Sequence, residues 1–310
     1  MKQLSLQWRI TLLTALLIAC ACVCNIALDY LSMGALRLGP AGAALGTTLS
    51  QAISVLLALL AIRKRGLGLP LHRSDLGPDK AVSGDILKIG FPITCQDGLI
   101  QVAFIVITVI ANQRGLTDAA AVGIVEKVIS FLFLVPSSML STVSALGAQN
   151  IGAGKPERIK PVYRDCILTV LLIGVPMCAL LYFFGQPLLG IYIAKDDPAY
   201  ASVIASGMVR VTYMGMTYFV CGIMETCCGM VRGLGRSWMP MVVTIFGACV
   251  LRIIWIYTIF QTHHTLDVLY LSYPVSWVVT SAVHVLCFVL IYRRMMARWN
   301  AHKEEENASY

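Results

Sequence analysis

The chain has 310 residues, of which 58% are hydrophobic and 13% charged, and its formal net charge is +8. A mean hydropathy of +0.77 excludes an ordinary soluble domain and indicates an all-α integral membrane protein embedded in a lipid bilayer. The lysines and arginines are spread between apolar runs instead of forming one patch, which argues against nucleic-acid binding.

Eight apolar stretches along the chain are long enough to cross a bilayer. The first two predicted spans are residues 10–31 and 41–62, and the second ends at the basic run from Arg63 to Arg65. Residues 66–85 are polar and carry several Gly and Pro residues, which predicts a cytoplasmic linker. The other six spans are expected at residues 86–111, 119–148, 166–184, 200–231, 239–260 and 267–292.

These stretches predict four parts: a helix pair in residues 1–65, the linker 66–85, a six-helix domain in residues 86–294 and a cytoplasmic tail in residues 295–310. Eighteen of the 24 lysines and arginines fall on one side of the predicted membrane when alternate loops are counted. Because positively charged short loops stay in the cytoplasm, we expect a multi-pass protein of the cell membrane with both termini cytoplasmic.

The eleven cysteines lie almost entirely within apolar helices, which favours a packing role over disulfides. Cys20, Cys22 and Cys24 point to different sides of one helix, so they do not form a metal site. The sequence also lacks a recognisable pairing of a nucleophile with a base. We therefore expect neither an enzyme, a metal site nor a cofactor.

Apart from Asp29 and Asp267 at span ends, three carboxylates fall inside predicted spans, where an ionised group normally faces a cavity or a partner. They are Asp97, Glu126 and Glu225, and Asp97 is accompanied on its helix by Gln96 and Gln101. We interpret these five residues as the lining of a substrate cavity. Hydrogen bonds between packed helices remain an alternative for Asp97, and an interfacial ion pair with Lys127 for Glu126.

Residues 212–219 are rich in Met and aromatic side chains, as promiscuous apolar binding sites are, and Tyr213 is the candidate for a substrate wall. Ordinary helix packing would give the same pattern. Arg210 and Arg252 are expected to reach towards the membrane surface or to anchor their helices. His284 is expected to be a packed, hydrogen-bonded side chain.

The run Gly152-Ala-Gly-Lys155 is not a nucleotide-binding loop, because Gln149 and Pro156 stand where that motif needs a glycine and a hydroxyl residue. Instead, the stretch from Gly123 to Ile129 and the run Ala-Gln-Asn-Ile-Gly-Ala-Gly-Lys-Pro-Glu-Arg of residues 148–158 resemble the eighth helix and the following loop of MATE (multidrug and toxic compound extrusion) transporters.

This resemblance implies a transporter with two lobes of six helices, of which the chain looks like helices five to twelve. A four-helix N-terminal segment would then be missing, and residues 1–65 would be the last two helices of the N-lobe. The implied function is a secondary antiporter that exports organic cations or drugs in exchange for protons or sodium. A lipid-linked or polysaccharide flippase of the same superfamily, an inactive truncated fragment and an intramembrane enzyme are the alternatives.

The resemblance also implies a cation-coupling site. Archaeal and DinF-type members carry Asn-x-x-x-Asp on the fifth helix and a threonine on the sixth, which match Asn25, Asp29 and Thr47. The aspartate that these members carry on the first helix has no counterpart in the chain. In NorM-type members a glutamate contributes to a C-lobe site, but the matching position here is Ile100, so that role is not carried over.

Overall fold

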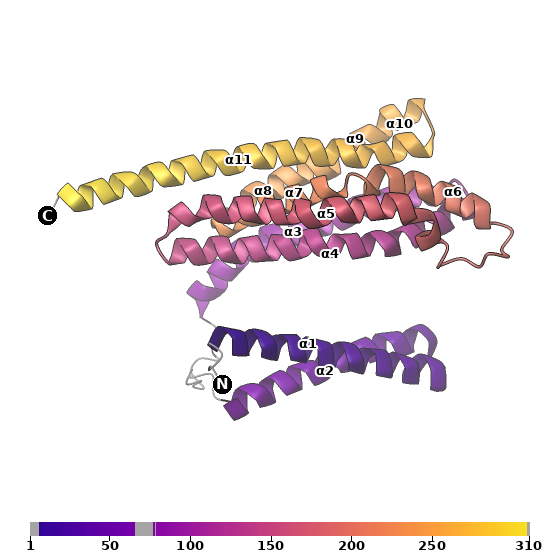
Figure 1. Ribbon diagram of the computed structural model, residues 1–310, viewed down its shortest axis with the longest axis horizontal. Helices are drawn as coiled ribbons and strands as arrows, with labels where there is room; N and C mark the ends of the chain where they lie inside the picture. The colour runs from indigo at the N-terminus through magenta and orange to yellow at the C-terminus, as the bar shows by residue number, and fades with distance from the viewer. Residues whose placement is uncertain (1–5, 66–76, 78, 309–310) are drawn as a thin grey trace. The chain divides into compact units, whose positions relative to one another are not determined.

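The computed structural model describes residues 6–65, 77 and 79–308, and every regular element in this part of the chain is helical (Figure 1). The chain divides into two compact units, Met1–Pro78 and Asp79–Tyr310. Most of the predicted linker, residues 66–76 and 78, lies outside the described residues.

The first unit is a helical hairpin. Helix α1 (Leu6–Asp29) continues into the π-helical segment η1 (Tyr30–Ala35), and α2 (Gly39–Arg65) returns beside it. Arg37 and Gly39 have positive φ angles of 50° and 55°, which turn the chain between the helices. Gly42 allows a close approach, since a Cβ there would lie 3.0 Å from the Ser32 carbonyl oxygen.

The second unit is a bundle that begins with α3 (Lys80–Asn112). Its next three spans are α4 (Leu116–Gly152), α5 (Ile159–Leu189), which follows the short η3 turn (Pro156–Arg158), and a bent span made of α6 (Tyr200–Arg210), η4 (Val211–Gly215) and α7 (Tyr218–Gly233). The last two are an interrupted span of α8 (Trp238–Thr244), η5 (Ile245–Val250), α9 (Leu251–Tyr257) and α10 (Ile259–Thr262), and the long α11 (Leu266–Ala308).

Most helices extend beyond their predicted ends, as α5 does at Ile159–Leu189 against a predicted 166–184, and two of these differences change the predicted linker and tail. Helix α3 begins at Lys80 and not at residue 86, because the Asp79 carboxylate accepts hydrogen bonds from the backbone N–H groups of Ala81 and Val82 and so caps the helix. The segment predicted as a tail from residue 295 is helical, since α11 continues to Ala308.

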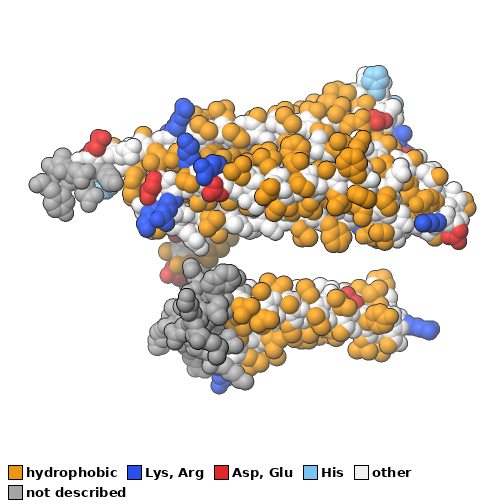
Figure 2. All heavy atoms as spheres, viewed as in Figure 1, with side chains coloured by type: hydrophobic (Ala, Val, Ile, Leu, Met, Phe, Trp, Pro, Cys, Tyr) orange, Lys and Arg blue, Asp and Glu red, His pale blue; other side chains and the backbone are white. Residues whose placement is uncertain are grey.

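Within the described residues, seven helices are long and apolar enough to cross a membrane. The pair Tyr200–Gly215 and Tyr218–Gly233, bent by 41°, makes an eighth span if it is counted as one. This confirms the predicted all-α membrane fold. Figure 2 shows hydrophobic side chains covering the visible face of the bundle in the second unit, with Lys and Arg on this face gathered mainly towards its ends. Leu172 and Phe183, 77% and 74% exposed, belong to this apolar exterior.

Helix α7 is the centre of the bundle and contacts α4, α5 and α11. Its small residues let the backbones meet: a Cβ on Gly229 would collide with the Leu140 carbonyl of α4 and lie 2.7 Å from Val143. All eleven cysteines are free, and Cys227 and Cys228 are fully packed in α7, as the packing role predicted. The turns at one end are tied together, since Arg114 Nη1 donates to the His264 carbonyl at 2.5 Å.

Candidate functional site

The second unit contains an open cavity of about 510 Å³, which we call the central cavity. This volume lies within the range of about 300–1,000 Å³ that is usual for small-molecule sites. Side chains of α3, α4, α6, α7, α9 and α11 line it, together with residues of η4 and η5. Its polar lining residues are Gln96, Asp97, Gln101, Glu126, Ser130, Ser137, Ser141, Arg210, Glu225 and Arg252.

Five of the six residues predicted for a substrate cavity therefore come together: Gln96, Asp97, Gln101, Glu126 and Glu225. They come from three helices that are separate in the sequence. The first three lie on α3, Glu126 lies on α4 and Glu225 lies on α7. Gln96 is 2% exposed and its amide donates to Cys228 Sγ at 3.8 Å, while its carbonyl Oε1 has no hydrogen-bond partner among the described residues.

The three carboxylates differ in their partners. Asp97 Oδ1 lies 3.9 Å from Nη2 of Arg232, and Glu126 Oε2 lies 4.0 Å from Nη2 of Arg210. Glu225 is 8% exposed and takes part in none of the ion pairs found in the described ranges. Glu225 is therefore the cavity carboxylate without a direct ion pair, and the Arg232 charge acts on it only over a longer distance.

The ion pair between Glu126 and Lys127, which was the alternative to a cavity position for Glu126, is absent from the described contacts. Adjacent positions on a helix point in different directions, and Lys127 lies over the ring of Tyr192, with Nζ 5.5 Å from its centroid. Glu126 faces the cavity and Arg210 instead.

Of the two roles expected for Arg210 and Arg252, reaching towards the membrane surface is wrong, whereas anchoring their helices agrees with their contacts. They are 4% and 2% exposed, and both line the central cavity. Arg210 donates from Nη1 to the Val122 carbonyl at 3.1 Å, and Arg252 donates from Nε to Ser276 Oγ at 2.7 Å. Partners on neighbouring helices hold both side chains inside the bundle, which a single-sequence pattern does not reveal.

Tyr213 is not among the residues that line the central cavity. It lies half-buried in η4, where it packs against the apolar core. The aromatic lining comes instead from Tyr218 and Trp277, whose rings form an edge-to-face pair with centroids 5.4 Å apart, and from Phe104. The sequence offered no signal for Phe104 or Trp277, since each is one apolar residue in an apolar span.

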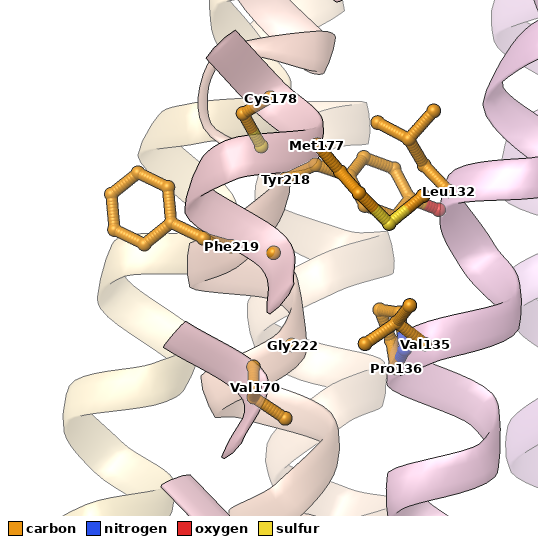
Figure 3. A pocket seen from close by; sticks show the side chains of 10 residues that line it. Leu132, Val135, Pro136, Val170, Met177, Cys178, Tyr218, Phe219 and Gly222 are labelled. Atoms are coloured by element: carbon orange, nitrogen blue, oxygen red, sulfur yellow. The ribbon is translucent and has the colours of Figure 1, made fainter. Parts of the chain in front are cut away.

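A second hollow lies between α4, α5 and α7 and is lined by apolar groups such as Leu132, Val170, Met177 and Phe219 (Figure 3). Its volume is about 10 Å³, which is no more than about one water molecule needs. We therefore do not consider it a ligand site.

The first unit brings together the residues proposed for cation coupling. Asn25 Nδ2 lies 3.5 Å from Thr47 Oγ1, and Asp29 stands one helical turn after Asn25 on α1. Asp29 Oδ1 is buried without a hydrogen-bond partner among the described groups, and Gly46 of α2 faces it so closely that a Cβ would collide with that oxygen. The hairpin thus contains an unsatisfied carboxylate oxygen one helical turn from Asn25, whose amide contacts the Thr47 hydroxyl.

Metal-binding clusters of three or more His, Cys, Asp or Glu residues do not occur in the part of the chain that the structure describes. His284 is fully buried and its Nε2 lies 3.0 Å from Thr244 Oγ1, which confirms the predicted packed, hydrogen-bonded side chain.

The MatE family model matches residues 92–258, which include most of the central cavity, and the chain belongs to this family. Among curated relatives, it is 28% identical over 213 residues to the "Probable multidrug resistance protein YoeA" of Bacillus subtilis, an alignment that covers 68% of the chain and 45% of the relative. The chain thus spans about half the length of the curated relatives it matches.

Solved structures share the fold, and two of them do so at 18% identity. One is a crystal structure of MATE in complex with MaL6, with a TM-score of 0.82 over 91% of this chain and 63% of that one. The other is a MOP superfamily transporter from Pyrococcus furiosus, with a TM-score of 0.81 over 90% of this chain and 62% of that one. The latter is described by the words "Reverse polarity of binding pocket suggests different function".

Proposed function

We propose that the chain is part of a secondary antiporter that exports small organic cations, with the central cavity as the substrate site. The observation that carries this proposal is Glu225, a buried carboxylate without an ion-pair partner in the described residues, in a cavity lined by Tyr218, Trp277 and Phe104. A buried carboxylate in a cavity with aromatic walls suits a flat or lipophilic cation, which gains charge pairing with Glu225 and cation–π contact with Tyr218, the named ring that does not lie over Arg252.

The coupling ion in this proposal is a proton or sodium, and Asp29 with Asn25 and Thr47 accepts it. A carboxylate whose buried oxygen has no partner can take a proton or a sodium ion without displacing an existing hydrogen bond. The antiporter is further proposed to lie in the cell membrane with both termini in the cytoplasm, since most lysines and arginines fall in loops of one side.

The experiment is equilibrium binding of tetraphenylphosphonium, a lipophilic aromatic cation, to the purified chain in lipid nanodiscs. Glu225→Gln keeps the size of the side chain and should raise the Kd about tenfold or more, because it removes a charge partner in a weakly screened site. Asp165→Asn is the matched control, since that carboxylate is 61% exposed and lies outside the cavity. Equal affinity of wild type and Glu225→Gln would contradict the proposal.

A flippase for lipid-linked anions is the second candidate, and the two arginines in the cavity favour it. Two considerations favour the antiporter. The lining has three carboxylates against these two arginines, and Arg210 already faces Glu126. If the chain binds farnesyl diphosphate and not tetraphenylphosphonium, the flippase is supported over the antiporter.

A further inference from the structure

Arg252 carries a buried positive charge that the surrounding protein does not neutralise. It is 2% exposed, and the ion pairs found among described residues involve other arginines, namely Arg114, Arg164, Arg210 and Arg232. Its one side-chain hydrogen bond in the described set runs from Nε to Ser276 Oγ. An unpaired charge at membrane depth is costly, so it normally has a function or a ligand.

The guanidinium is held in a fixed place by a cage of aromatic rings. Its Cζ lies 4.2 Å from the ring centroid of Tyr273, 5.7 Å from that of Trp277 and 5.8 Å from that of Phe104. The Ser276 hydroxyl donates to the Tyr273 carbonyl at 2.8 Å, which turns its lone pairs towards Arg252 Nε. Cation–π contacts and this hydrogen bond therefore orient the side chain and leave the terminal N–H groups available at the cavity that it lines.

Arg252 and Arg210 also lie next to interruptions of the regular α-helix. Arg252 stands just after the π-helical segment η5, and Arg210 ends α6 just before the π-helical segment η4. Such π-helical segments cost stability and occur often at functional sites. Both arginines are thus carried into the cavity where the regular helix is interrupted.

The central cavity has one charged group of each sign that makes no direct ion pair, and Glu225 has only the more distant Arg232 charge to balance it. Glu126 faces Arg210 and Asp97 faces Arg232, whereas Glu225 and Arg252 have no such partner among the described side chains. A ligand with a cationic group and an acidic group would neutralise both. A guanidinium binds a carboxylate through two parallel N–H groups, and the Tyr218 ring, which also lines the cavity, suits an aromatic body.

We propose that Arg252 is an anion-binding subsite that takes the carboxylate of a zwitterionic aromatic substrate, while the cationic group of that substrate pairs with Glu225. This inference rests on the proposed function of the central cavity and specifies its substrate class. A simple lipophilic cation would use the Glu225 side alone.

The test compares two dyes that differ by one ester group. Rhodamine B is a zwitterion with a free carboxylate at neutral pH, and its ethyl ester is a cation of nearly the same shape. Binding is measured by fluorescence anisotropy to the chain in nanodiscs, for wild type, Arg252→Gln, Arg252→Lys and the control Arg164→Gln, whose side chain is 70% exposed. Farnesyl diphosphate is included because a lipid diphosphate also offers acidic groups.

The proposal predicts that wild type binds rhodamine B at least as tightly as the ester. Arg252→Gln should raise the Kd of rhodamine B about tenfold and that of the ester less than about twofold, with Arg252→Lys in between. Equal weakening of both dyes would make Arg252 a purely structural cation, and no change in either would exclude an anion subsite.

The wild-type comparison decides the matter even if Arg252→Gln does not fold. If wild type binds the ester but not rhodamine B, the anion-binding subsite is excluded and the proposed cation site at Glu225 is still supported. If farnesyl diphosphate binds in place of rhodamine B and its binding depends on Arg252, the proposal of a zwitterionic substrate is wrong. Binding of neither dye, together with failure to bind tetraphenylphosphonium, overturns the proposed function and this inference with it.

Discussion

Arg210 on α6 contacts Glu126 on α4, with 4.0 Å between Nη2 and Oε2, and the same guanidinium donates from Nη1 to the Val122 carbonyl one turn earlier on α4. The arginine is 4% exposed, whereas the Glu126 side chain is 53% exposed. The two partners of this pair are therefore not equivalent: one is committed to the packing of the bundle and the other faces the cavity.

This asymmetry predicts different costs for removing each partner. Arg210→Gln should lower the free energy of unfolding by about 2 kcal/mol, since it breaks a charged hydrogen bond to a buried backbone carbonyl. Glu126→Gln should cost less than about 1 kcal/mol, because that side chain is largely solvated. Thermal unfolding of the two variants in the same detergent checks this, and equal losses would contradict it.

The contact between α4 and α7 depends on a glycine. Gly229→Ala should lower the free energy of unfolding by about 1–3 kcal/mol, because a Cβ there would collide with the Leu140 carbonyl and crowd Val143. Gly123→Ala on α4 is the matched control, since nothing lies within 4 Å of its Cβ position. The control should be neutral or slightly stabilising through helix propensity. A Gly229→Ala variant as stable as this control would show that the helices can separate without penalty.

Much of the fold was predictable from the sequence, because span length and apolar composition are properties of each stretch alone. The interruptions were not. The π-helical segments η4 and η5 lie inside uniform apolar runs, where a shift in backbone hydrogen bonding leaves no trace in residue type. The start of α3 at Lys80 was missed because the Asp79 cap lies in a polar stretch that predicts a linker.

The site was predictable only in part, and for a similar reason. Asp97 and Glu225 were identified because a carboxylate in an apolar span is conspicuous. Arg252 is equally conspicuous, but a long side chain can reach the membrane surface, and only the rings of Tyr273 and Trp277 on α11 reveal that it turns inwards. Tyr213 was assigned to the cavity from composition, which does not tell which face of the helix a residue occupies.

The orientation of the spans makes a prediction about topology. Alkaline phosphatase fused after Gly115 should be active, because that turn is predicted to be outside, and green fluorescent protein fused after Lys155 should fluoresce in the cytoplasm. The turn at residues 112–116 contacts the turn at His264, which is predicted on the same side. Reporters that place both fusion points on one side would refute the predicted orientation.

The proposed role of Asp29 in ion coupling predicts how Asp29→Asn affects transport. In proteoliposomes that take up tetraphenylphosphonium under an imposed proton or sodium gradient, Asp29→Asn should abolish gradient-driven uptake, because the amide cannot exchange a proton or balance a sodium charge. Equilibrium binding of the same cation should change by less than about twofold, since the cavity residues are untouched. Uptake that persists at the wild-type rate in Asp29→Asn would remove this residue from the mechanism.

The central claim is that the cavity between α3, α4 and α7 is where substrate binds, and the location of a bound cation tests it most directly. Tetraphenylarsonium has the shape of tetraphenylphosphonium, and its arsenic atom gives an anomalous signal in diffraction from crystals of the complex. We predict one dominant peak inside the central cavity, beside Glu225 and the rings of Tyr218 and Trp277. A dominant peak on the lipid-facing exterior, with the cavity empty, would contradict the claim.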